Sequence, residues 1–226
     1  MADIFIISAP SGSGKSTLVN RLRETVPDLE FSISYTTRGP RGSEQNSREY
    51  YFVTREEFET MARHGEFLEH AEVHGNCYGT ARRFLEIAAQ RGNDLLLDID
   101  VQGAEQIKRK LPQAIGIFIL PPSRGELERR LRERSQDSDA NIQRRLEAAA
   151  REIENYWKYD YILVNDRLPK SVKELQAILL AERQKRRGKT DANLSAQAEM
   201  CRLDRMRERL QPILESFQKT AAGGGK

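Results

Sequence analysis

The chain has 226 residues, of which 38% are hydrophobic and 31% charged, so it carries enough apolar sequence for a core and is not expected to be disordered. No apolar run approaches the roughly 20 residues that span a bilayer, and no basic segment precedes the first apolar run, so we expect neither a transmembrane segment nor a secretory signal. The two cysteines, Cys77 and Cys201, suffice for neither a disulfide framework nor a zinc site and fit a reducing cytoplasm.

The net charge of +3 is concentrated at the C-terminal end. Residues 181–226 contain 11 Lys and Arg against 6 Asp and Glu, whereas the rest of the chain contains 26 against 28. A nearly neutral body argues against a nucleic-acid-binding protein, whose binding face is usually basic.

Strand and helix patterns alternate along the chain. An apolar, β-branched run at 4–8 is followed by a glycine-rich loop and then by apolar residues at helical spacing from Leu18 to Val26. Further buried strands are expected at 95–98, 114–120 and 161–164, and helices at 102–110, 124–134, 141–156 and 170–187. Continuously apolar strands between helices predict an α/β fold with a parallel sheet whose faces are covered.

The loop after the first strand is the strongest functional signal. Its glycines let the backbone wrap a phosphate chain, and the following helix offers free N–H groups and the positive end of its dipole. In such a loop Lys15 reaches the β- and γ-phosphates, and the Ser16 hydroxyl binds Mg²⁺. The predicted ATP phosphate-binding residues are Ser11, Gly12, Ser13, Gly14, Lys15, Ser16 and Thr17.

Two aspartates, Asp98 and Asp100, lie at the end of the second apolar strand and just after it. Asp98 ends that strand, where a carboxylate can hold Mg²⁺, through water, beside nucleotide phosphates. The simpler alternative is an aspartate that only caps the end of the strand. Asp98 and Asp100 lie on the same side of an extended chain, which favours a functional pair.

Several motifs, in one order and spacing, resemble the guanylate kinase signature. They are Thr36-Thr37-Arg38, Arg41, Glu44, Tyr50-Tyr51-Phe52, Tyr78-Gly79-Thr80 and LDIDVQG at 97–103. The resemblance runs from about Ile4 to about Arg187. Ser47 and Ala9 depart from it, since glycine is usual at 47 in the family and at 9 in the strict phosphate loop. The resemblance implies a P-loop three-layer core with a parallel sheet, an inserted GMP-binding subdomain and a helical lid.

The resemblance also assigns a GMP-binding set. It implies that Ser34, Glu69, Thr80 and Asp100 surround guanine, while Arg38, Arg41, Tyr50 and Tyr78 hold the GMP phosphate. The chemistry agrees, because ionised carboxylates accept from guanine N1–H and N2–H₂, and a serine hydroxyl can donate to O6. Arginines and tyrosine hydroxyls suit a phosphate dianion.

Arginines are frequent between residues 124 and 145. Arg130, Arg134 and Arg145 match the family's lid arginines, which would stabilise the charge on the transferring phosphoryl group. Ion pairing along a helix surface is the preferred explanation for Arg124, Arg129 and Arg132. Asn165 resembles the family's adenine-side loop, although Asn-Asp after a strand is also an ordinary turn.

Taken together, the residues predict an ATP- and Mg²⁺-dependent kinase that phosphorylates GMP, and also dGMP, in the cytoplasm, with no nucleic-acid or membrane partner. A sugar-phosphate kinase on the same scaffold would not need Glu69 and Asp100. An inactive binding module of guanylate kinase type would not need Lys15. A switch GTPase would carry an Asn-Lys-x-Asp motif after a strand, which this sequence lacks.

The expected domain organisation follows the resemblance. A guanylate kinase-like domain at 1–187 would contain a core (1–33, 84–122 and 150–187), a GMP-binding insertion at 34–83 and a lid at 123–149. A linker at 188–193, an amphipathic helical tail at 194–220 and a disordered end at 221–226 would follow.

The tail carries an apolar stripe at spacings of three and four, formed by Leu203, Met206, Leu210, Ile213 and Phe217. Ser195 could cap this helix, and Pro212 is expected to kink it. Three roles stay open for the stripe: packing on the body, pairing in a homo-oligomer, or binding an anionic surface together with 183–189. Because no proposed catalytic residue lies beyond Asp166, a chain ending at Gly188 is expected to retain turnover.

Overall fold

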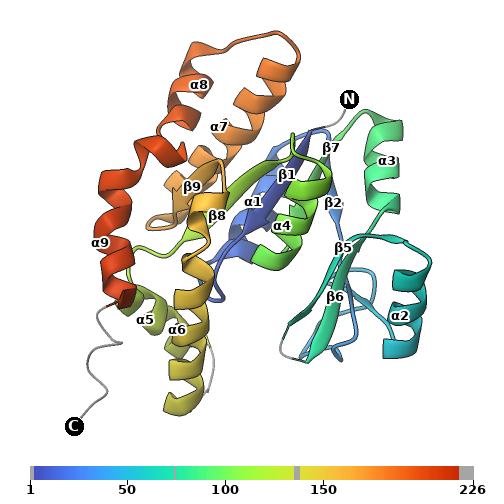
Figure 1. Ribbon diagram of the computed structural model, residues 1–226. Coiled ribbons are helices and arrows are strands. Elements are labelled where there is room, and N and C mark those ends of the chain that lie inside the picture. The colour runs from blue at the N-terminus through green and yellow to red at the C-terminus, as the bar shows by residue number, and fades with distance from the viewer. Residues whose placement is uncertain (1–2, 74, 135–137, 219–226) are drawn as a thin grey trace. The chain divides into compact units, whose positions relative to one another are not determined.

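The computed structural model describes residues 3–73, 75–134 and 138–218; the side chain of Arg134 and the predicted disordered end lie outside this description. Five strands form a sheet in the order β2-β7-β1-β8-β9, in which β2 pairs with β7 and β8 with β9 in parallel. Helices follow most of these strands along the chain (Figure 1). The predicted α/β class with a parallel sheet is confirmed.

Four of the five strands occur where the sequence predicts them. The sheet consists of β1 (Ile4–Ser8), β2 (Leu29–Ser32), β7 (Asp94–Asp98), β8 (Ile115–Leu120) and β9 (Tyr161–Val164). Every residue of β1, β8 and β9 is buried, which explains their continuously apolar sequences. β2 was not predicted, because four residues that include Glu30 show no apolar run; it is an edge strand that pairs in register with β7.

The chain forms two compact units. Unit 1 comprises residues 1–6 and 27–115, and unit 2 comprises residues 7–26 and 116–226, so that β1 is shared between them. None of the helices in the described part of the chain has the length and apolar character needed to cross a membrane.

Unit 1 contains a second sheet, of order β4-β3-β6-β5, within the polar segment that the sequence marks as an insertion. It consists of β3 (Tyr35–Thr36), β4 (Tyr51–Phe52), β5 (Phe67–Val73) and β6 (Asn76–Ala81), accompanied by α2 (Arg55–Arg63), α3 (Arg83–Arg91) and α4 (Val101–Lys110). A small core of Tyr35, Phe58, Phe67 and Ala81 lies between this sheet and α2. The β5–β6 hairpin carries Glu69 and Thr80, two of the four residues predicted to surround guanine, so this local core helps to position them.

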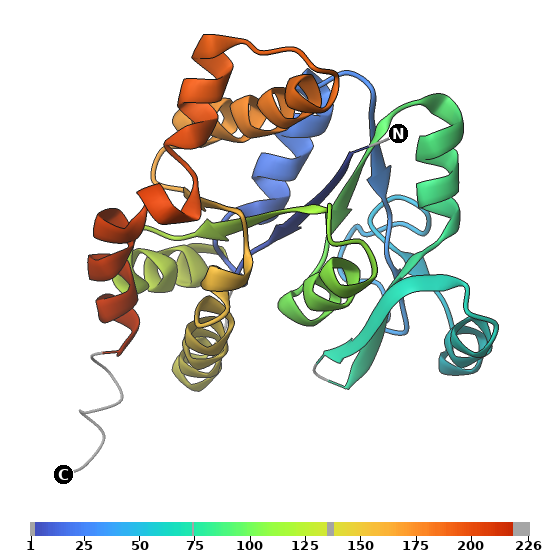
Figure 2. The same ribbon diagram turned by 45° about the horizontal axis from the view of Figure 1, so that its top comes forward.

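Unit 2 contains the remaining helices. They are α1 (Lys15–Thr25), α5 (Arg124–Arg134), α6 (Asp139–Ile153), α7 (Leu168–Arg186), α8 (Ala192–Glu199) and α9 (Arg207–Gln218), with 3-10 turns at Tyr156–Lys158 and Leu203–Arg205. α7 packs on α1 and α8, and α9 packs on α5 and α6 (Figures 1 and 2). The helix predicted at 141–156 begins earlier, because the Ser138 side chain caps it, and ends at Ile153.

The tail differs from the single amphipathic helix predicted at 194–220. It forms two helices, and the N-cap of the first is Asp191, whose side chain accepts the N–H groups of Asn193 and Leu194; Ser195 therefore lies inside α8 and is not its cap. The helix is interrupted before α9, and Pro212 lies within α9. The interruption arises because residues 201–203 use their backbone groups to bond the edge strand β9.

Candidate phosphoryl-transfer site

The glycine-rich loop occupies residues 9–14 of unit 2, between β1 and α1. Gly12 and Gly14 have φ angles of 91° and 87°, a left-handed conformation that residues with a side chain rarely adopt. The Leu18 N–H donates to the carbonyl of Gly14, the N-cap of α1. The backbone N–H groups of residues 15–17 come before this bond and lie at the N-terminal end of the helix. Lys15 and Ser16 are the first two residues of that helix. This is the geometry of an anion-binding helix N-terminus.

The same two glycines are also closely covered by neighbouring residues. A β-carbon at Gly12 would lie 2.7 Å from Leu131 Cδ2 and 2.9 Å from Leu127 Cδ1, both on α5. A β-carbon at Gly14 would collide with the side-chain amide of Asn165. Glycine is therefore required here by close packing as well as by backbone conformation.

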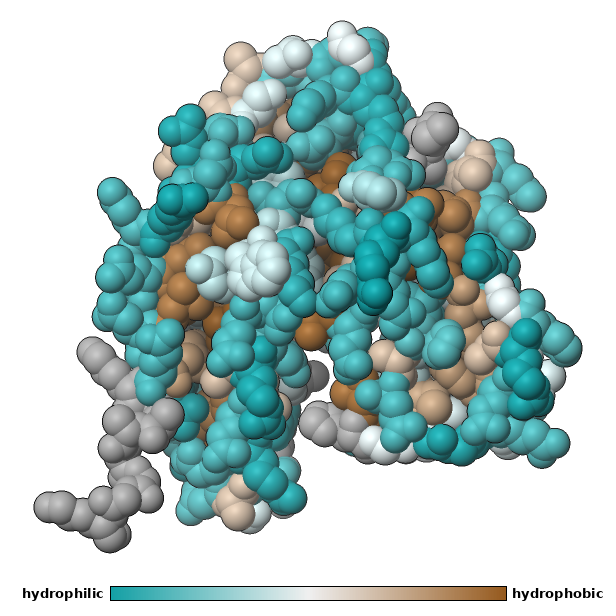
Figure 3. Space-filling model, in the orientation of Figure 1, coloured by the Kyte–Doolittle hydropathy of each residue, from teal (hydrophilic) through white to brown (hydrophobic). Residues whose placement is uncertain are grey.

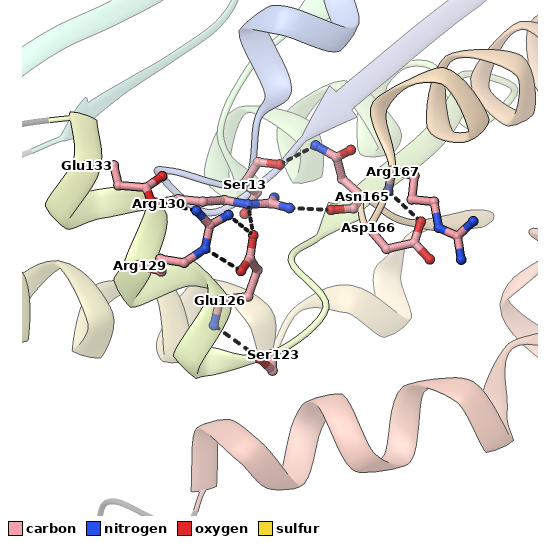
Figure 4. Close-up of polar contacts among 9 residues, drawn as sticks. All are labelled: Ser13, Ser123, Glu126, Arg129, Arg130, Glu133, Asn165, Asp166 and Arg167. Atoms are coloured by element: carbon pink, nitrogen blue, oxygen red, sulfur yellow. Dashed lines mark hydrogen bonds and ion pairs between the residues drawn. The ribbon is translucent and has the colours of Figure 1, made fainter.

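Asn165, the residue that follows β9, bonds this loop through its side chain. Its side chain is buried, and its Nδ2 donates to the Ser13 carbonyl at 2.8 Å. Its backbone N–H donates to the Leu120 carbonyl, and its own carbonyl accepts from Arg130 Nη2 at 2.9 Å (Figure 4). The residue predicted to lie on the adenine side thus makes direct contacts with both the loop and the lid helix α5.

Two of the predicted lid arginines contact groups around the loop. Arg130 donates to Glu126 Oε1 at 2.7 Å as well as to Asn165, and Arg145 on α6 donates to Ser11 Oγ at 2.9 Å. Glu126 and Arg130, four residues apart on α5, thus form an ion pair. Arg134 is the last residue of α5, and its side chain lies outside the described residues. Arg130 and Arg145 therefore place two guanidinium groups beside the loop of unit 2.

Of the three arginines predicted to form surface ion pairs, Arg129 and Arg132 do so, whereas the Arg124 guanidinium donates to the side-chain amide oxygen of Gln143 at 3.1 Å. Arg129 bonds both Glu126 and Glu133, and Arg132 bonds both Glu128 and Asp139. Hydrogen bonds from Arg129, together with those from Arg130, lower the pKa of Glu126 to about 2. Glu126 is therefore ionised at neutral pH and links the surface arginine Arg129 to Arg130, which reaches inward (Figure 4).

Unit 1 carries the residues predicted to bind GMP. Glu69 on β5 is directly opposite Thr80 on β6, and both side chains are buried. Asp100 is the N-cap of α4, where its Oδ1 accepts the Gly103 N–H at 2.8 Å. Both carboxylates lie against Gly103, since a β-carbon there would be 2.9 Å from Glu69 Cδ and 3.5 Å from Asp100 Oδ1. The structure therefore brings Glu69, Thr80 and Asp100 together.

Glu69 is unusually placed for an acid. Glu69 is only 4% exposed to solvent. Burial, followed by the nearby Asp100 charge, raises the pKa of Glu69 to about 7, although Thr80 opposes the shift. The buried Glu69 carboxyl group, once ionised, therefore suits a ligand that supplies hydrogen-bond donors.

A second cluster in unit 1 gathers the predicted phosphate-binding residues. Arg38 is buried and forms a two-bond pair with Glu44, at 3.0 and 3.1 Å, while Glu44 also accepts the Arg41 N–H at 2.8 Å. The guanidinium carbon of Arg38 lies 5.2 Å from the centre of the Tyr50 ring, which packs edge-on against Tyr78. The hydrogen bond from Arg38 is the main reason that the pKa of Glu44 is lowered.

Two further predicted GMP-binding residues, Ser34 and Arg41, belong to the same unit. The Ser34 carbonyl accepts the Tyr51 N–H at 2.9 Å, just before β3, and Arg41 is exposed. Ser47, which departs from the family pattern, has a φ of 66°, the conformation that the usual glycine adopts without strain. Its N–H closes the turn by donating to the Tyr50 carbonyl at 2.8 Å.

Sequence reasoning assigned no role to two residues that organise these clusters. Gly103 makes room for the Glu69 carboxylate, and Glu44 holds Arg38 and the Arg41 backbone. Both residues lie within motifs named in the sequence analysis. For Gly103, the available signal was a glycine in a predicted helix, three residues after Asp100. Their roles depend on contacts between separate elements, which the pattern does not reveal.

A glycine loop that leads from a buried strand into a helix, in a parallel α/β sheet, defines the class of P-loop nucleotide-binding proteins. Comparison with known proteins narrows this class, since a model of the family "Guanylate kinase" matches residues 1–182. The chain belongs to the guanylate kinase family and is a nucleoside monophosphate kinase.

The relatives agree along most of the chain. A guanylate kinase of Koribacter versatilis is 60% identical over 223 residues, or 95% of each chain. One of Geobacter metallireducens is 53% identical over 180 residues, 80% of this chain and 89% of that one. A crystal structure of guanylate kinase from Anaplasma phagocytophilum superposes with a TM-score of 0.67 at 36% identity, covering 93% of this chain and 94% of that one.

Proposed function

We propose that this chain transfers the γ-phosphate of ATP to GMP, producing ADP and GDP. The observation that carries the proposal most directly is the placement of the buried Glu69 carboxylate and the partly exposed Asp100 carboxylate beside Gly103, which suits the N1–H and N2–H₂ donors of guanine. Adenine would present a bare N1 lone pair to the same carboxylates. A site built on such hydrogen bonds rejects the wrong base strongly, because its acids are then left unpaired.

On the ATP side, the proposed roles follow from the loop geometry. The N–H groups at the open end of α1 and the Lys15 ammonium group bind the phosphates. Arg130, Arg134 and Arg145 stabilise the charge that spreads over the transferring phosphoryl oxygens. Ser11, Gly12, Ser13, Gly14, Ser16 and Thr17 complete the loop, and Asn165 keeps it in place from the side proposed to face adenine.

The chain also offers ligands for magnesium. The Ser16 hydroxyl, exposed at the start of α1, and the Asp98 carboxylate, at the end of β7, are oxygen donors of the kind that Mg²⁺ prefers, so the residues fit the ion. We propose that they hold it, Asp98 through water. When bound, the ion would supply positive charge that offsets the negative charge of the ATP phosphates.

On the GMP side, Arg38 and Arg41 with the hydroxyls of Tyr50 and Tyr78 bind the phosphate of GMP, the group that accepts the γ-phosphoryl group of ATP. The Ser34 hydroxyl and Thr80 complete the guanine contacts. None of these proposed contacts uses the ribose 2′-hydroxyl, so we propose that dGMP is accepted as well. The free thiols of Cys77 and Cys201 are consistent with a cytoplasmic location.

A coupled ADP-release assay tests the proposal with GMP, dGMP, AMP, UMP and a sugar phosphate as acceptors. We expect turnover with GMP and dGMP alone. Lys15→Met should lose turnover while GMP binding persists, and Arg21→Met, an exposed residue of the same helix, serves as the control. Equal ADP release with AMP or the sugar phosphate would contradict the assignment of Glu69 and Asp100.

A further inference from the structure

The C-terminal segment lies beyond the part of the chain that the family model matches. That match ends at residue 182, whereas α8 and α9 occupy residues 192–218. The match with the Koribacter versatilis relative covers 95% of this chain and so includes most of this segment, whereas the match with Geobacter metallireducens covers 80% of the chain. The family signature therefore assigns it no role.

The segment is bonded to the edge of the main sheet. Ile162 N–H of β9 donates to the Cys201 carbonyl at 2.8 Å, and Leu203 N–H donates to the Asp160 carbonyl at 3.2 Å. The Arg202 guanidinium lies 5.1 Å from the centre of the Tyr161 ring. These bonds cover part of an edge strand and fix the point from which α9 starts.

The apolar stripe of the tail is buried within the same unit. Met206, Leu210, Ile213 and Phe217 are between 2% and 7% exposed. α9 packs on α5 and α6, and hydrophobic side chains are visible between α9 and α6 (Figure 3). Of the three roles open from the sequence, packing on the body is the one that the structure shows.

The contact of α9 with α5 includes a specific polar bond. Arg124 N–H, in the first turn of α5, donates to Ser216 Oγ at 3.0 Å, while Ser216 Oγ donates to the Ile213 carbonyl at 2.6 Å. A helix leaves its first N–H groups without partners of its own, and a hydroxyl acceptor normally comes from the residue just before the helix. Ser123 does this for Glu126 N–H, so Ser216 is a second cap supplied from 92 residues away.

α5 in turn contacts the ATP phosphate loop. Leu127 and Leu131 lie against Gly12, and Arg130 bonds the Asn165 carbonyl. A second link runs from Arg209 Nη2 to Asp166 Oδ2 at 3.4 Å, next to the residue that braces Ser13. Each end of α9 therefore contacts an element that itself contacts the loop. Ser216 bonds α5, and Arg209 bonds the residue that follows Asn165.

We propose that α9 is a positioning element for the ATP half of the site, with Ser216 capping the lid helix α5 and Arg209 holding the loop after β9. The inference rests on the proposed function. Loss of these contacts lets α5 shift relative to Gly12, so that ATP binding and turnover suffer while the GMP residues, all in unit 1, are unaffected. This differs from the expectation that a chain ending at Gly188 retains turnover.

The first experiment uses Ser216→Ala and Arg209→Ala in the full chain, with Ser195→Ala and Arg207→Ala as matched controls on α8 and α9. Loss of a helix cap costs enough to lower kcat/KM for ATP about threefold to tenfold. The dissociation constant for GMP alone should not change. Ser216→Thr, which keeps the hydroxyl, should restore activity, and hydrogen exchange at the start of α5 should accelerate in Ser216→Ala only.

A chain ending at Met206 removes α9 while keeping the cover of β9. We expect a larger fall in kcat/KM for ATP than in either point variant, partly restored by a peptide of residues 207–218. Unchanged ATP kinetics in Ser216→Ala, or an equal loss of GMP affinity, would overturn the inference. A wild-type chain without GMP kinase activity would instead defeat the proposed function, so the two failures are distinguishable.

Discussion

Gly103 lies against the carboxylate of Glu69, so closely that a β-carbon at position 103 would collide with Glu69 Oε2. Gly103 is the third residue of α4, where glycine destabilises a helix by roughly 0.5–1 kcal/mol relative to alanine. The glycine therefore makes room for the buried acid at a cost to the helix. Asp100, which caps α4 by accepting the Gly103 N–H, shares the same space.

Gly103→Ala should consequently impair GMP use. The added methyl group displaces Glu69, and we expect KM for GMP to rise at least about tenfold, equivalent to roughly 1.4 kcal/mol, with KM for ATP unchanged. Steady-state kinetics with each substrate varied in turn measures this. Gly125→Ala, in the first turn of α5 where only Ser123 Oγ is near, is the control and should leave both constants intact. Equal KM values for GMP in the two variants would refute the steric role of Gly103.

Glu69 should make the stability of the ligand-free protein depend on pH. Its pKa is raised to about 7 by burial, so the folded state retains a proton that the unfolded state releases at lower pH. Stability therefore falls as pH rises from about 4.5 to 7, by roughly 3 kcal/mol for a shift of this size. Glu69→Gln, which cannot ionise, should lose this dependence and be more stable than wild type at pH 8.

Urea unfolding at pH 5 and pH 8 measures the effect. Glu72→Gln, on the same strand but exposed, should keep the wild-type dependence. If both variants follow the wild-type curve, the buried carboxyl group does not titrate in this range.

The same titration should control GMP binding. If the ionised form of Glu69 accepts from guanine, affinity falls about tenfold per pH unit below 7, because the carboxyl must first lose its proton. Glu69→Gln should weaken GMP by roughly 1–3 kcal/mol at pH 8, and AMP should gain relative to GMP. Calorimetry with guanosine separates this effect from titration of the phosphate. A constant GMP/AMP ratio in Glu69→Gln would show that the side chain does not touch the base.

Asn165→Asp should destabilise the phosphate loop. The buried Nδ2 donates to the Ser13 carbonyl at 2.8 Å, and a carboxylate in its place would put two acceptors together. We expect a loss of at least about 2 kcal/mol in unfolding free energy and a higher KM for ATP. Acidic pH should partly restore stability, since a protonated aspartic acid can donate. Asn155→Asp, whose amide bonds the exposed end of α6, is the control in thermal melts; a similar loss there would remove the special role of Asn165.

Ser47→Gly should stabilise the turn before Tyr50. Ser47 has a φ of 66°, which costs a residue with a β-carbon roughly 1–2 kcal/mol, part of which the greater freedom of glycine in the unfolded chain offsets. The net gain should raise Tm by about 1–3 °C without altering kinetics. Ser195→Gly, inside α8, should have the opposite sign. A lower Tm for Ser47→Gly would mean that its side chain contributes more than its backbone conformation costs.

The sequence alone determined the α/β class, four strands of the main sheet and the family, because each depends on local patterns. Continuous apolar runs identify β1, β7, β8 and β9, and the loop motif predicts how the chain passes from β1 into α1. The same local logic predicted surface ion pairs for Arg129 and Arg132, since residues three and four apart share a helix face.

Only the tertiary structure decided what lies across elements. β2 is a strand because β7 provides its partner, and Gly103 matters because β5 brings Glu69 to it. Ser216 caps a helix that begins at Arg124, and the tail is interrupted where its backbone bonds β9. Local periodicity reports which face of a segment is apolar, whereas the partner that covers this face is chosen by long-range packing and by the bonding needs of buried backbone groups.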